Sequence, residues 1–153
     1  MNQLLDEDRV VILAAPGGRS EVIECAARLL AGDSPSAAGA ISQSLHARER
    51  LASTAIGHGV AIPHGRIAGV EHSRGAFMRL DTPVDFGAID GVPVDLVLAM
   101  AVPEHFVEQH LQQLAELAER FGSAEFRETL RRAPSVRHLA ACLRAGGQRR
   151  SAA

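Results

Sequence analysis

One histidine, His64, stands between Pro63 and Gly65 at the end of a run of small residues. Proline has a fixed φ and glycine bends without steric cost, so the sequence predicts that this imidazole is held at a turn. A histidine with an ordinary pKa of about 6.5 is mostly neutral at pH 7, which leaves one ring nitrogen free as a nucleophile. The hydroxyls of Ser53 and Thr54 and the glycine amides upstream can donate hydrogen bonds to an anion on that nitrogen, and Gly65 is expected in the same phosphate loop. These residues predict a site where a histidine carries a phosphoryl group.

A second histidine, His110, falls in a predicted helix over 107–121. Its spacing places it beside Leu114, Leu117 and Phe121, at the margin of the apolar face. One interpretation is a boundary histidine satisfied by a backbone carbonyl. The other is a ring that donates a hydrogen bond to a phosphate on His64.

Arg48 stands near the end of another helical segment, next to Glu49 and Arg50. Cations are favourable at a helix C-terminus, so a solvated helix end explains this arginine. A planar, permanently charged guanidinium also matches phosphate oxygens better than an ammonium does. Both interpretations stay open on the residues alone.

The stretch 48–65 reads R-E-R-L-A-S-T-A-I-G-H-G-V-A-I-P-H-G, and it resembles the phosphohistidine segment of the fructose/mannitol-type enzyme IIA domains of the bacterial phosphotransferase system. The resemblance continues through 83–97, Pro103 and the pair His110-Leu111, and covers about residues 8–145. It implies that His64 is the phosphoryl acceptor, His110 the second active-site histidine and Arg48 the cation facing the phosphate. Ala52 and Ala55 stand where the family usually has glycine.

With 153 residues, the chain has the size of one domain, predicted over 1–147 with a disordered tail over 148–153. Sixteen basic and 18 acidic residues give a net charge of −2, which provides no electrostatic footprint for nucleic acid. No apolar run approaches the length of about 20 residues that crosses a bilayer. Cys25 and Cys142 fall in helical apolar patterns and predict two buried free thiols in a reducing cytoplasm, with a disulfide as the alternative.

The periodicity predicts two helices, one capped by Ser20 and closed by Gly32, the other opened by Ser34-Pro35 and ending near Arg48. Further helices are predicted over 107–121, after Ser123 and after Ser135, the last ending at Gly146-Gly147. In the helix over 107–121, Val107 and Leu111 are expected on the buried stripe with Leu114, Ala118 and Phe121. Short strands are predicted at 10–13, 60–62 and 76–80, with a central strand at 94–102. This order predicts an α/β fold, and the resemblance implies a mixed central sheet flanked by helices on both faces.

The sequence contains no P-loop, acidic metal cluster or nucleotide fingerprint, so we expect no cofactor and no metal. A metal site built from several histidines remains an alternative, although no spacing matches a common ligand pair. Its candidate ligands are His58, His64, His72, His105 and His110.

The resemblance is strongest to the free-standing, nitrogen-regulatory branch of the family. It implies a cytoplasmic phosphoryl carrier, rather than a self-contained enzyme, that accepts phosphate from an HPr-type carrier and acts on regulatory targets such as a sensor kinase or ion transporter. The alternative is a sugar-specific enzyme IIA that passes phosphate to a separate IIB protein for fructose or mannitol uptake.

Overall fold

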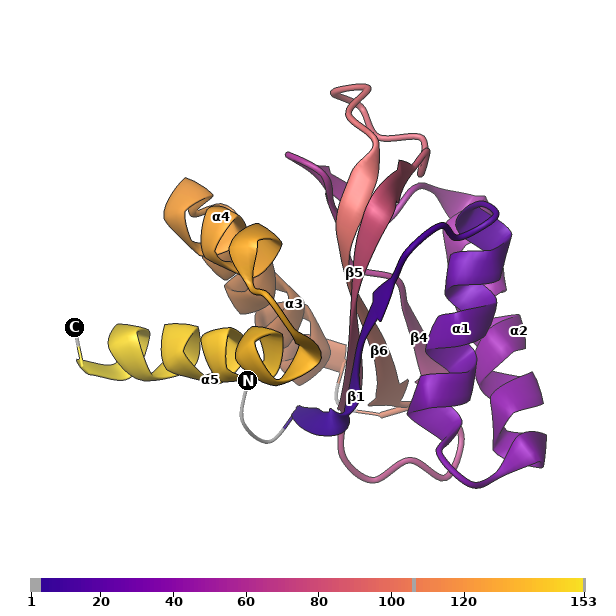
Figure 1. Cartoon of the computed structure of the whole chain (residues 1–153). Helices are drawn as coiled ribbons and strands as arrows, with labels where there is room; N and C mark the ends of the chain where they lie inside the picture. The colour runs from indigo at the N-terminus through magenta and orange to yellow at the C-terminus, as the bar shows by residue number, and fades with distance from the viewer. Residues whose placement is uncertain (1–3, 106, 153) are drawn as a thin grey trace.

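The computed structural model describes residues 4–105 and 107–152, and a mixed sheet lies at its centre between two groups of helices (Figure 1). Helices α1 (Arg19–Ala31) and α2 (Pro35–Leu51) cover one face of the sheet. Helices α3 (Val107–Phe121), α4 (Ala124–Arg132) and α5 (Val136–Ala152) lie on the other. The predicted α/β fold, with helices on both faces of a mixed sheet, is confirmed.

The sheet has six strands in the order β1-β5-β6-β3-β2, and β4 pairs with β6 as well. Strand β6 runs parallel to β3 and β4 and antiparallel to β5, while β1 runs parallel to β5. The strands are β1 (Leu5–Leu13), β2 (Ala55–Gly57), β3 (Val60–Ala61), β4 (His64–Ile67), β5 (Arg74–Val84) and β6 (Val94–Pro103).

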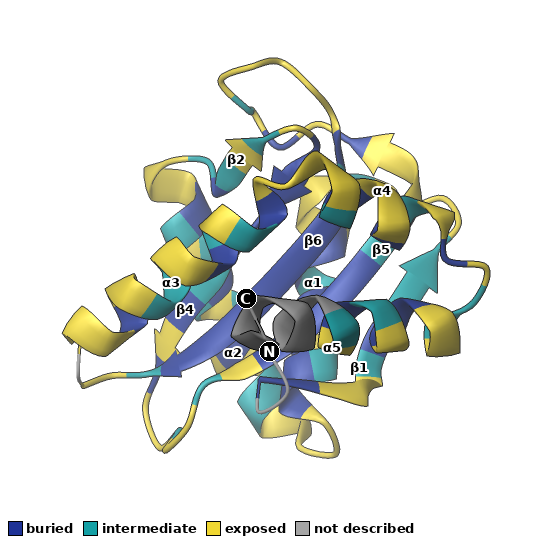
Figure 2. Ribbon diagram, turned by 90° about the vertical axis from the view of Figure 1, so that its left-hand side faces the viewer, coloured by how far each residue is buried: buried dark blue, intermediate teal, exposed yellow. Residues whose placement is uncertain are grey.

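Strand β6 forms the centre of the molecule, and this explains its continuous apolar run. Its side chains alternate between two cores, so that Val97 packs toward α1 and α2 while Leu96 and Leu98 pack toward α3 to α5. Both faces are covered, and the strand appears dark blue along most of its length in Figure 2. Such a strand needs apolar residues at successive positions rather than at alternate ones.

Several helix boundaries agree with their predicted capping residues. The hydroxyls of Ser34 and Ser123 accept hydrogen bonds from Ala37 N and Phe126 N at 3.3 and 3.2 Å, and Gly32 ends α1 with a φ of 60°. Helix α1 instead begins at Arg19, one residue before the predicted cap Ser20.

Two predicted helix ends were wrong. Helix α2 runs to Leu51 rather than ending near Arg48, and α5 continues past Gly146 and Gly147 to Ala152. Glycine lowers helix propensity but does not forbid the helical conformation, so the pair does not terminate α5. The disorder expected for 148–153 stays a prediction, and Ala153 lies outside the described residues.

The buried stripe of α3 differs from the predicted one. Leu117, Phe121 and His110 are buried, whereas Val107 and Leu111 are 40% and 61% exposed. Two overlapping apolar stripes are possible at helical spacing, and the sheet selects the one that contains His110. The helix therefore buries a histidine and exposes a valine and a leucine at its first turns.

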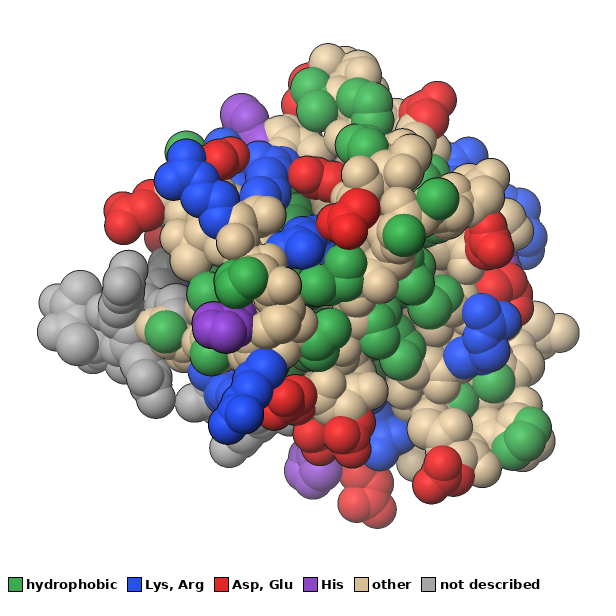
Figure 3. Space-filling model, in the orientation of Figure 1, with side chains coloured by type: hydrophobic (Ala, Val, Ile, Leu, Met, Phe, Trp, Pro, Cys, Tyr) green, Lys and Arg blue, Asp and Glu red, His purple; other side chains and the backbone are tan. Residues whose placement is uncertain are grey.

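Cys25 and Cys142 are free thiols, as predicted, but both are half-buried rather than buried. Burial raises the pKa of the Cys25 thiol. None of the described helices is both long enough and apolar enough to span a membrane. Acidic and basic side chains are interspersed over the face shown in Figure 3, in agreement with the small net charge.

Candidate functional site

His64 opens strand β4, and the turn predicted around it is absent. Strands β3 and β4 pair with β6 in one continuous register, with Val60 opposite Leu96 and His64 opposite Met100. They are separated at Pro63, which has no N–H to donate to the ladder. The Pro63 carbonyl still accepts a hydrogen bond from Met100 N at 2.8 Å. The proline thus interrupts the ladder without turning the chain, and His64 sits on a well-anchored backbone.

Gly65 allows β4 to approach α2 closely. A Cβ atom at this position would lie 2.3 Å from Ser44 Oγ and 3.1 Å from the Ser44 carbonyl carbon. The Ser44 hydroxyl also donates a hydrogen bond to the Arg66 carbonyl at 3.1 Å. Gly65 was expected in the phosphate loop, and its visible contribution here is to packing. It brings the strand that carries His64 against the helix that carries Arg48.

The imidazole of His64 is fixed in one tautomer by the backbone. Its Nδ1 lies 2.8 Å from the Ile62 carbonyl oxygen, which can only accept, so Nδ1 carries the proton and Nε2 keeps a free lone pair. Burial, followed by the charge of Arg48, lowers the pKa of His64 below its usual value, although the hydrogen bond to Ile62 and the charge of Glu49 oppose this change. The half-buried ring is therefore neutral at pH 7, with Nε2 as its nucleophilic atom.

Arg48, the cation predicted to face the phosphate, acts on His64 through its charge. Its Nη1 donates a 2.8 Å hydrogen bond to the Ala52 carbonyl at the end of α2, and its charge acts on the His64 ring. The guanidinium is thus held by the helix end, at a place from which its charge lowers the pKa of the imidazole. The helix-end interpretation and the phosphate-facing interpretation of this arginine are compatible.

The hydroxyls of Ser53 and Thr54 are both engaged within the protein. Ser53 donates to the Phe86 carbonyl, and Thr54, which is 5% exposed, donates to the Glu49 carboxylate at 2.6 Å. Either hydroxyl would have to break a hydrogen bond before it could bind a phosphate. The two residues shape the segment before His64, and their hydroxyls are directed to partners within the protein.

Glu49 is the residue of this site that sequence reasoning missed. Its side chain is buried and accepts hydrogen bonds from both Thr54 N and Thr54 Oγ1. The signal was present in the spacing, because Ile41, Leu45 and Glu49 follow one another at four-residue steps on α2. Such a pattern predicts a glutamate on the buried face of its helix, where it needs polar partners.

The tight turn between β2 and β3 is held by residues of the 83–97 segment and of α4. Gly57, His58 and Gly59 all have a positive φ, at 96°, 57° and 80°. Asp90 accepts a 2.9 Å hydrogen bond from His58 N, and Arg131 donates to the His58 carbonyl at 2.6 Å. Strain in this turn is therefore balanced by side chains from the 83–97 segment and from α4.

Arg131 is itself held in place by Asp95, which accepts two hydrogen bonds from it at 2.9 and 3.0 Å. Its terminal nitrogen would also lie 2.7 Å from a Cβ atom on Gly59, so this glycine is needed both for its φ and for the close approach.

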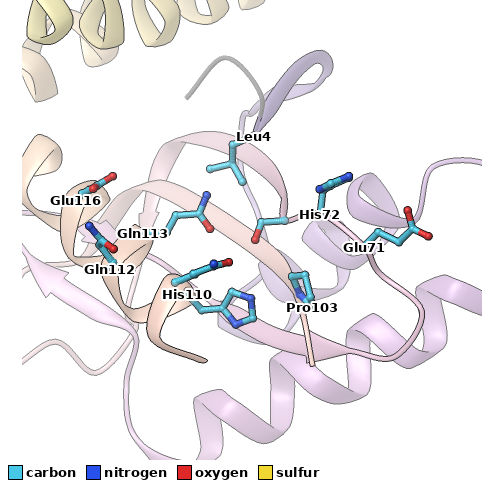
Figure 4. A pocket seen from close by; sticks show the side chains of 10 residues that line it. Leu4, Glu71, His72, Pro103, His110, Gln112, Gln113 and Glu116 are labelled. Carbon is cyan, nitrogen blue, oxygen red and sulfur yellow. The ribbon is translucent and has the colours of Figure 1, made fainter. Parts of the chain in front are cut away.

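His110 lies on the first turns of α3 and lines a cavity of about 810 Å³ between this helix and the segment before β5 (Figure 4). The residue is 8% exposed, and its Nδ1 has no hydrogen-bond partner among the described residues. Burial, followed by the charge of Arg66, lowers the pKa of His110. His72, Pro103 and Glu116 line the same cavity.

Arg66 shares strand β4 with His64, and its charge acts on His110. On β4, His64 and Arg66 project to one face of the sheet, because side chains two residues apart share a face. The opposite face of the strand holds Gly65 and Ile67, which pack toward α1 and α2. The Arg66 charge acts on His110, so the three residues lie on the α3 side of the sheet. None of the described contacts joins His110 directly to His64.

A metal centre finds no support in the side-chain arrangement of the described residues. Within this part of the chain, no three side chains of His, Cys, Asp or Glu are grouped so that they could hold an ion. The five histidines considered from the sequence therefore do not assemble into a ligand set.

Comparison with known proteins assigns the fold and the site to a family. The model of the phosphoenolpyruvate-dependent sugar phosphotransferase system EIIA 2 family matches residues 3–145. The chain belongs to this family. It is therefore an EIIA-type phosphocarrier domain, as the sequence resemblance predicted.

The relatives of this EIIA 2 domain include regulatory proteins. It is 40% identical to a nitrogen regulatory protein of Pseudomonas aeruginosa over 140 residues, and the match covers 91% of each chain. The crystal structure of nitrogen regulatory protein IIA-Ntr from Neisseria meningitidis superimposes with a TM-score of 0.84 at 39% identity, covering 92% of this chain and 97% of that one. IIA mannitol from Escherichia coli has a TM-score of 0.74 at 22% identity over 91% and 98% of the two chains, a likeness of fold.

Proposed function

We propose that this EIIA 2 domain accepts a phosphoryl group on Nε2 of His64 from an HPr-type phosphocarrier and acts mainly as a regulatory protein. The observation that carries the proposal is the 2.8 Å hydrogen bond between His64 Nδ1 and the Ile62 carbonyl. It commits the proton to Nδ1 and leaves Nε2 as the nucleophile on a half-buried, neutral ring. Membership of the EIIA 2 family supplies the reaction class.

The transfer needs positioning and charge rather than a cofactor. The bond between phosphorus and the carrier's ring nitrogen breaks as the bond to His64 Nε2 forms, with the two nitrogens in line. The His64 ring keeps the proton on Nδ1, so it becomes positively charged as it gains the phosphoryl group. The Ile62 carbonyl then accepts a charge-assisted hydrogen bond, which is stronger than the neutral one.

Arg48 is the cation we assign to the phosphoryl oxygens. Its charge already acts on the His64 ring, and its planar guanidinium suits the transferred group as negative charge spreads over the oxygens. His110 is the proposed second histidine, whose unpartnered Nδ1 provides a hydrogen-bonding atom on the same side of the sheet. We assign it to the encounter with the donor or acceptor protein rather than to the resting site.

The regulatory role rests on the relatives of highest identity described above, which are named nitrogen regulatory proteins. Under this role, the phosphorylation state of His64 changes contacts with targets such as a sensor kinase or ion transporter. A sugar-specific role would instead pass the phosphate to a IIB protein. The mannitol-type relatives have lower identity, so we place the regulatory role first.

The test is intact-mass spectrometry after incubation with phosphoenolpyruvate, enzyme I and an HPr-type carrier. We expect one acid-labile phosphate on the wild type, none on His64→Ala or His64→Gln, and a normal amount on His138→Ala, which removes an exposed histidine of α5. NMR of the phosphorylated ring identifies the nitrogen, and phosphate on Nδ1 would contradict the proposed geometry.

The downstream step separates the two roles. Rapid discharge of the phosphorylated protein onto a fructose- or mannitol-type IIB domain would favour the sugar-specific role. Slow discharge, together with target binding that differs between wild type and His64→Ala, would support the regulatory one. A wild-type protein that gains no phosphate with active partners would overturn the proposal.

A further inference from the structure

Glu49 is a buried carboxylate next to the proposed phosphorylation site. Only 7% of the residue is exposed, and both oxygens are occupied by Thr54, whose N donates at 3.2 Å and whose Oγ1 donates at 2.6 Å. Arg19 on α1 lies 3.9 Å from the same carboxylate, with a side chain that is 44% exposed. Burying a carboxylate costs free energy unless it is paired and hydrogen-bonded. The three polar groups around the Glu49 carboxylate offset that cost and hold its two oxygens in place.

A chain of hydrogen bonds leads from this carboxylate to His64. Thr54 donates twice to Glu49, and the Thr54 carbonyl accepts from Ile62 N at 3.0 Å. The Ile62 carbonyl in turn accepts from Nδ1 of His64 at 2.8 Å. Each residue in the series is fixed by the one before it. The carboxylate therefore determines where the oxygen that holds the His64 proton is placed.

The charges around His64 come from three elements. Arg48 and Glu49 lie at the end of α2 and act on the ring in opposite directions. Arg66 follows two residues later on the same face of β4, and beyond it lies His110 on α3. Strand β6 presents Met100 opposite His64 and contributes no charge there. Among the described residues, Glu49 is thus the negatively charged group that raises the pKa of the His64 ring.

We propose that Glu49 is a positioning residue that, through Thr54 and Ile62, holds the proton on Nδ1 of His64 and thereby speeds the departure of a phosphoryl group from Nε2. The inference rests on the proposed phosphorylation of His64. When phosphorus moves to an acceptor, its bond to Nε2 breaks and the electron pair stays on Nε2. With Nδ1 protonated, the ring leaves as neutral imidazole, whereas a deprotonated ring would leave as imidazolate, a much poorer leaving group. Glu49 acts at a distance from phosphorus and touches none of the reacting atoms.

The first measurement is made on the unphosphorylated full-length protein. Long-range proton–nitrogen NMR of the histidine rings gives the tautomer and the titration midpoint of His64. We expect Glu49→Gln, which keeps the shape and removes the charge, to lower that midpoint by about half a pH unit and to reduce the Nδ1–H tautomer. Glu24→Gln serves as the matched control, because Glu24 also accepts from a serine and a histidine but lies on α1 away from the chain of bonds.

The second measurement follows discharge of the phosphorylated protein onto an HPr-type carrier between pH 6 and pH 9. In Glu49→Gln, we expect discharge at pH 8 to be slower by roughly threefold, which corresponds to half a pKa unit, and the midpoint of the pH profile to move down. Thr54→Ser, which keeps the hydroxyl, should remain close to wild type. Thr54→Val removes one bond and should show a smaller change in the same direction, and it replaces Glu49→Gln if that variant does not fold.

The two proposals fail in distinguishable ways. A folded Glu49→Gln protein with an unchanged His64 titration and an unchanged discharge profile would overturn the role of Glu49. If the wild type itself accepts no phosphate, the proposed function fails, while the NMR titration still decides whether Glu49 acts on His64. A loss of stability in Glu49→Gln with no change in the midpoint would also overturn the inference, because it would show a purely structural residue.

Discussion

The two histidines that the sequence assigns to one site are held in very different ways. His64 lies on a strand, half-buried, with Nδ1 bonded to the Ile62 carbonyl and with charged neighbours of both signs. His110 lies on the first turns of α3, more deeply buried, with an Nδ1 that has no partner among the described residues. A group that must attack in a fixed direction gains from such preorganisation. A histidine that contacts a partner protein, as proposed for His110, can keep a ring nitrogen without a hydrogen-bond partner until that protein binds.

The elements that carry the two histidines differ in the same sense. Strand β4 is paired with β6 and pressed against α2 through Gly65. Helix α3 exposes Val107 and Leu111 at its beginning and borders a cavity on its inner side. The proposed nucleophile therefore lies on a strand that is paired and packed on both sides, and the second histidine lies at the start of a helix that borders a cavity. Substitutions at Gly65 in the first region and at His110 in the second test whether this difference matters.

The largest effect is expected where β4 meets α2. Gly65→Ala would place a Cβ within contact distance of Ser44 backbone and side-chain atoms, so the strand must move away from the helix. Overpacking of this kind costs about 1–3 kcal/mol, and the movement would displace His64 from Arg48. We expect a lower midpoint in urea unfolding and a strong reduction in phosphate uptake by intact-mass spectrometry.

Gly39→Ala provides the matched control on the same helix. Nothing lies within 4 Å of a Cβ at Gly39, so alanine there should raise helix stability by about 0.5–1 kcal/mol. Phosphate uptake should be unchanged. If Gly65→Ala behaved like Gly39→Ala in both measurements, close packing of β4 on α2 would not be what positions His64.

The fold and part of the site could be predicted because they depend on local patterns. The apolar run of 94–102, the caps Ser34 and Ser123 and the glycine at 32 carry their own signals in the sequence. The pairing of β4 with β6 does not, because a strand of four residues that begins after a proline resembles a turn. Only the long-range contact with the central strand makes it a strand.

The hydrogen bonds around the site were harder to predict than its residue types. The sequence predicts Ser53 and Thr54 as phosphate donors, but in the structure their hydroxyls already donate to Phe86 and Glu49. The same limit applies to α3, where two apolar stripes compete and the choice depends on the sheet. Residue chemistry was readable from the chain, whereas partner assignment required the tertiary structure.

A smaller effect is expected from replacing His110, whose buried Nδ1 has no hydrogen-bond partner among the described residues. His110→Leu removes the unpartnered buried Nδ1 and extends the apolar stripe of Leu114 and Leu117, so we expect stability to rise by up to about 1 kcal/mol at pH 7. Phosphate transfer should slow in the same variant if His110 meets the donor. A loss of stability of similar size would show that Nδ1 has a partner in the folded protein.

The same variant also changes the dependence of stability on pH. The pKa values of His110 and His64 are lowered in the folded state, so below about pH 6.5 the unfolded chain binds more protons than the folded one. Stability is therefore expected to fall as the pH drops through this range. His110→Leu removes one of the two groups and should flatten the decrease, measured as urea midpoints between pH 5 and pH 8.

The smallest effect is expected from removing one of the two opposed charges that act on His64. Arg48→Ala removes a cation that lowers the pKa of His64, so its titration midpoint should rise, whereas Glu49→Gln should lower it. The stability cost of Arg48→Ala should stay at about 0.5–1 kcal/mol, because the hydrogen bond that this side chain makes within the described residues is the one to Ala52. Arg48→Lys keeps the charge and should keep the midpoint while losing the planar donor. If the opposed charges act independently, the shift in the double variant of Arg48→Ala and Glu49→Gln should equal the sum of the two single shifts, and a departure from that sum would show that the two side chains also affect one another.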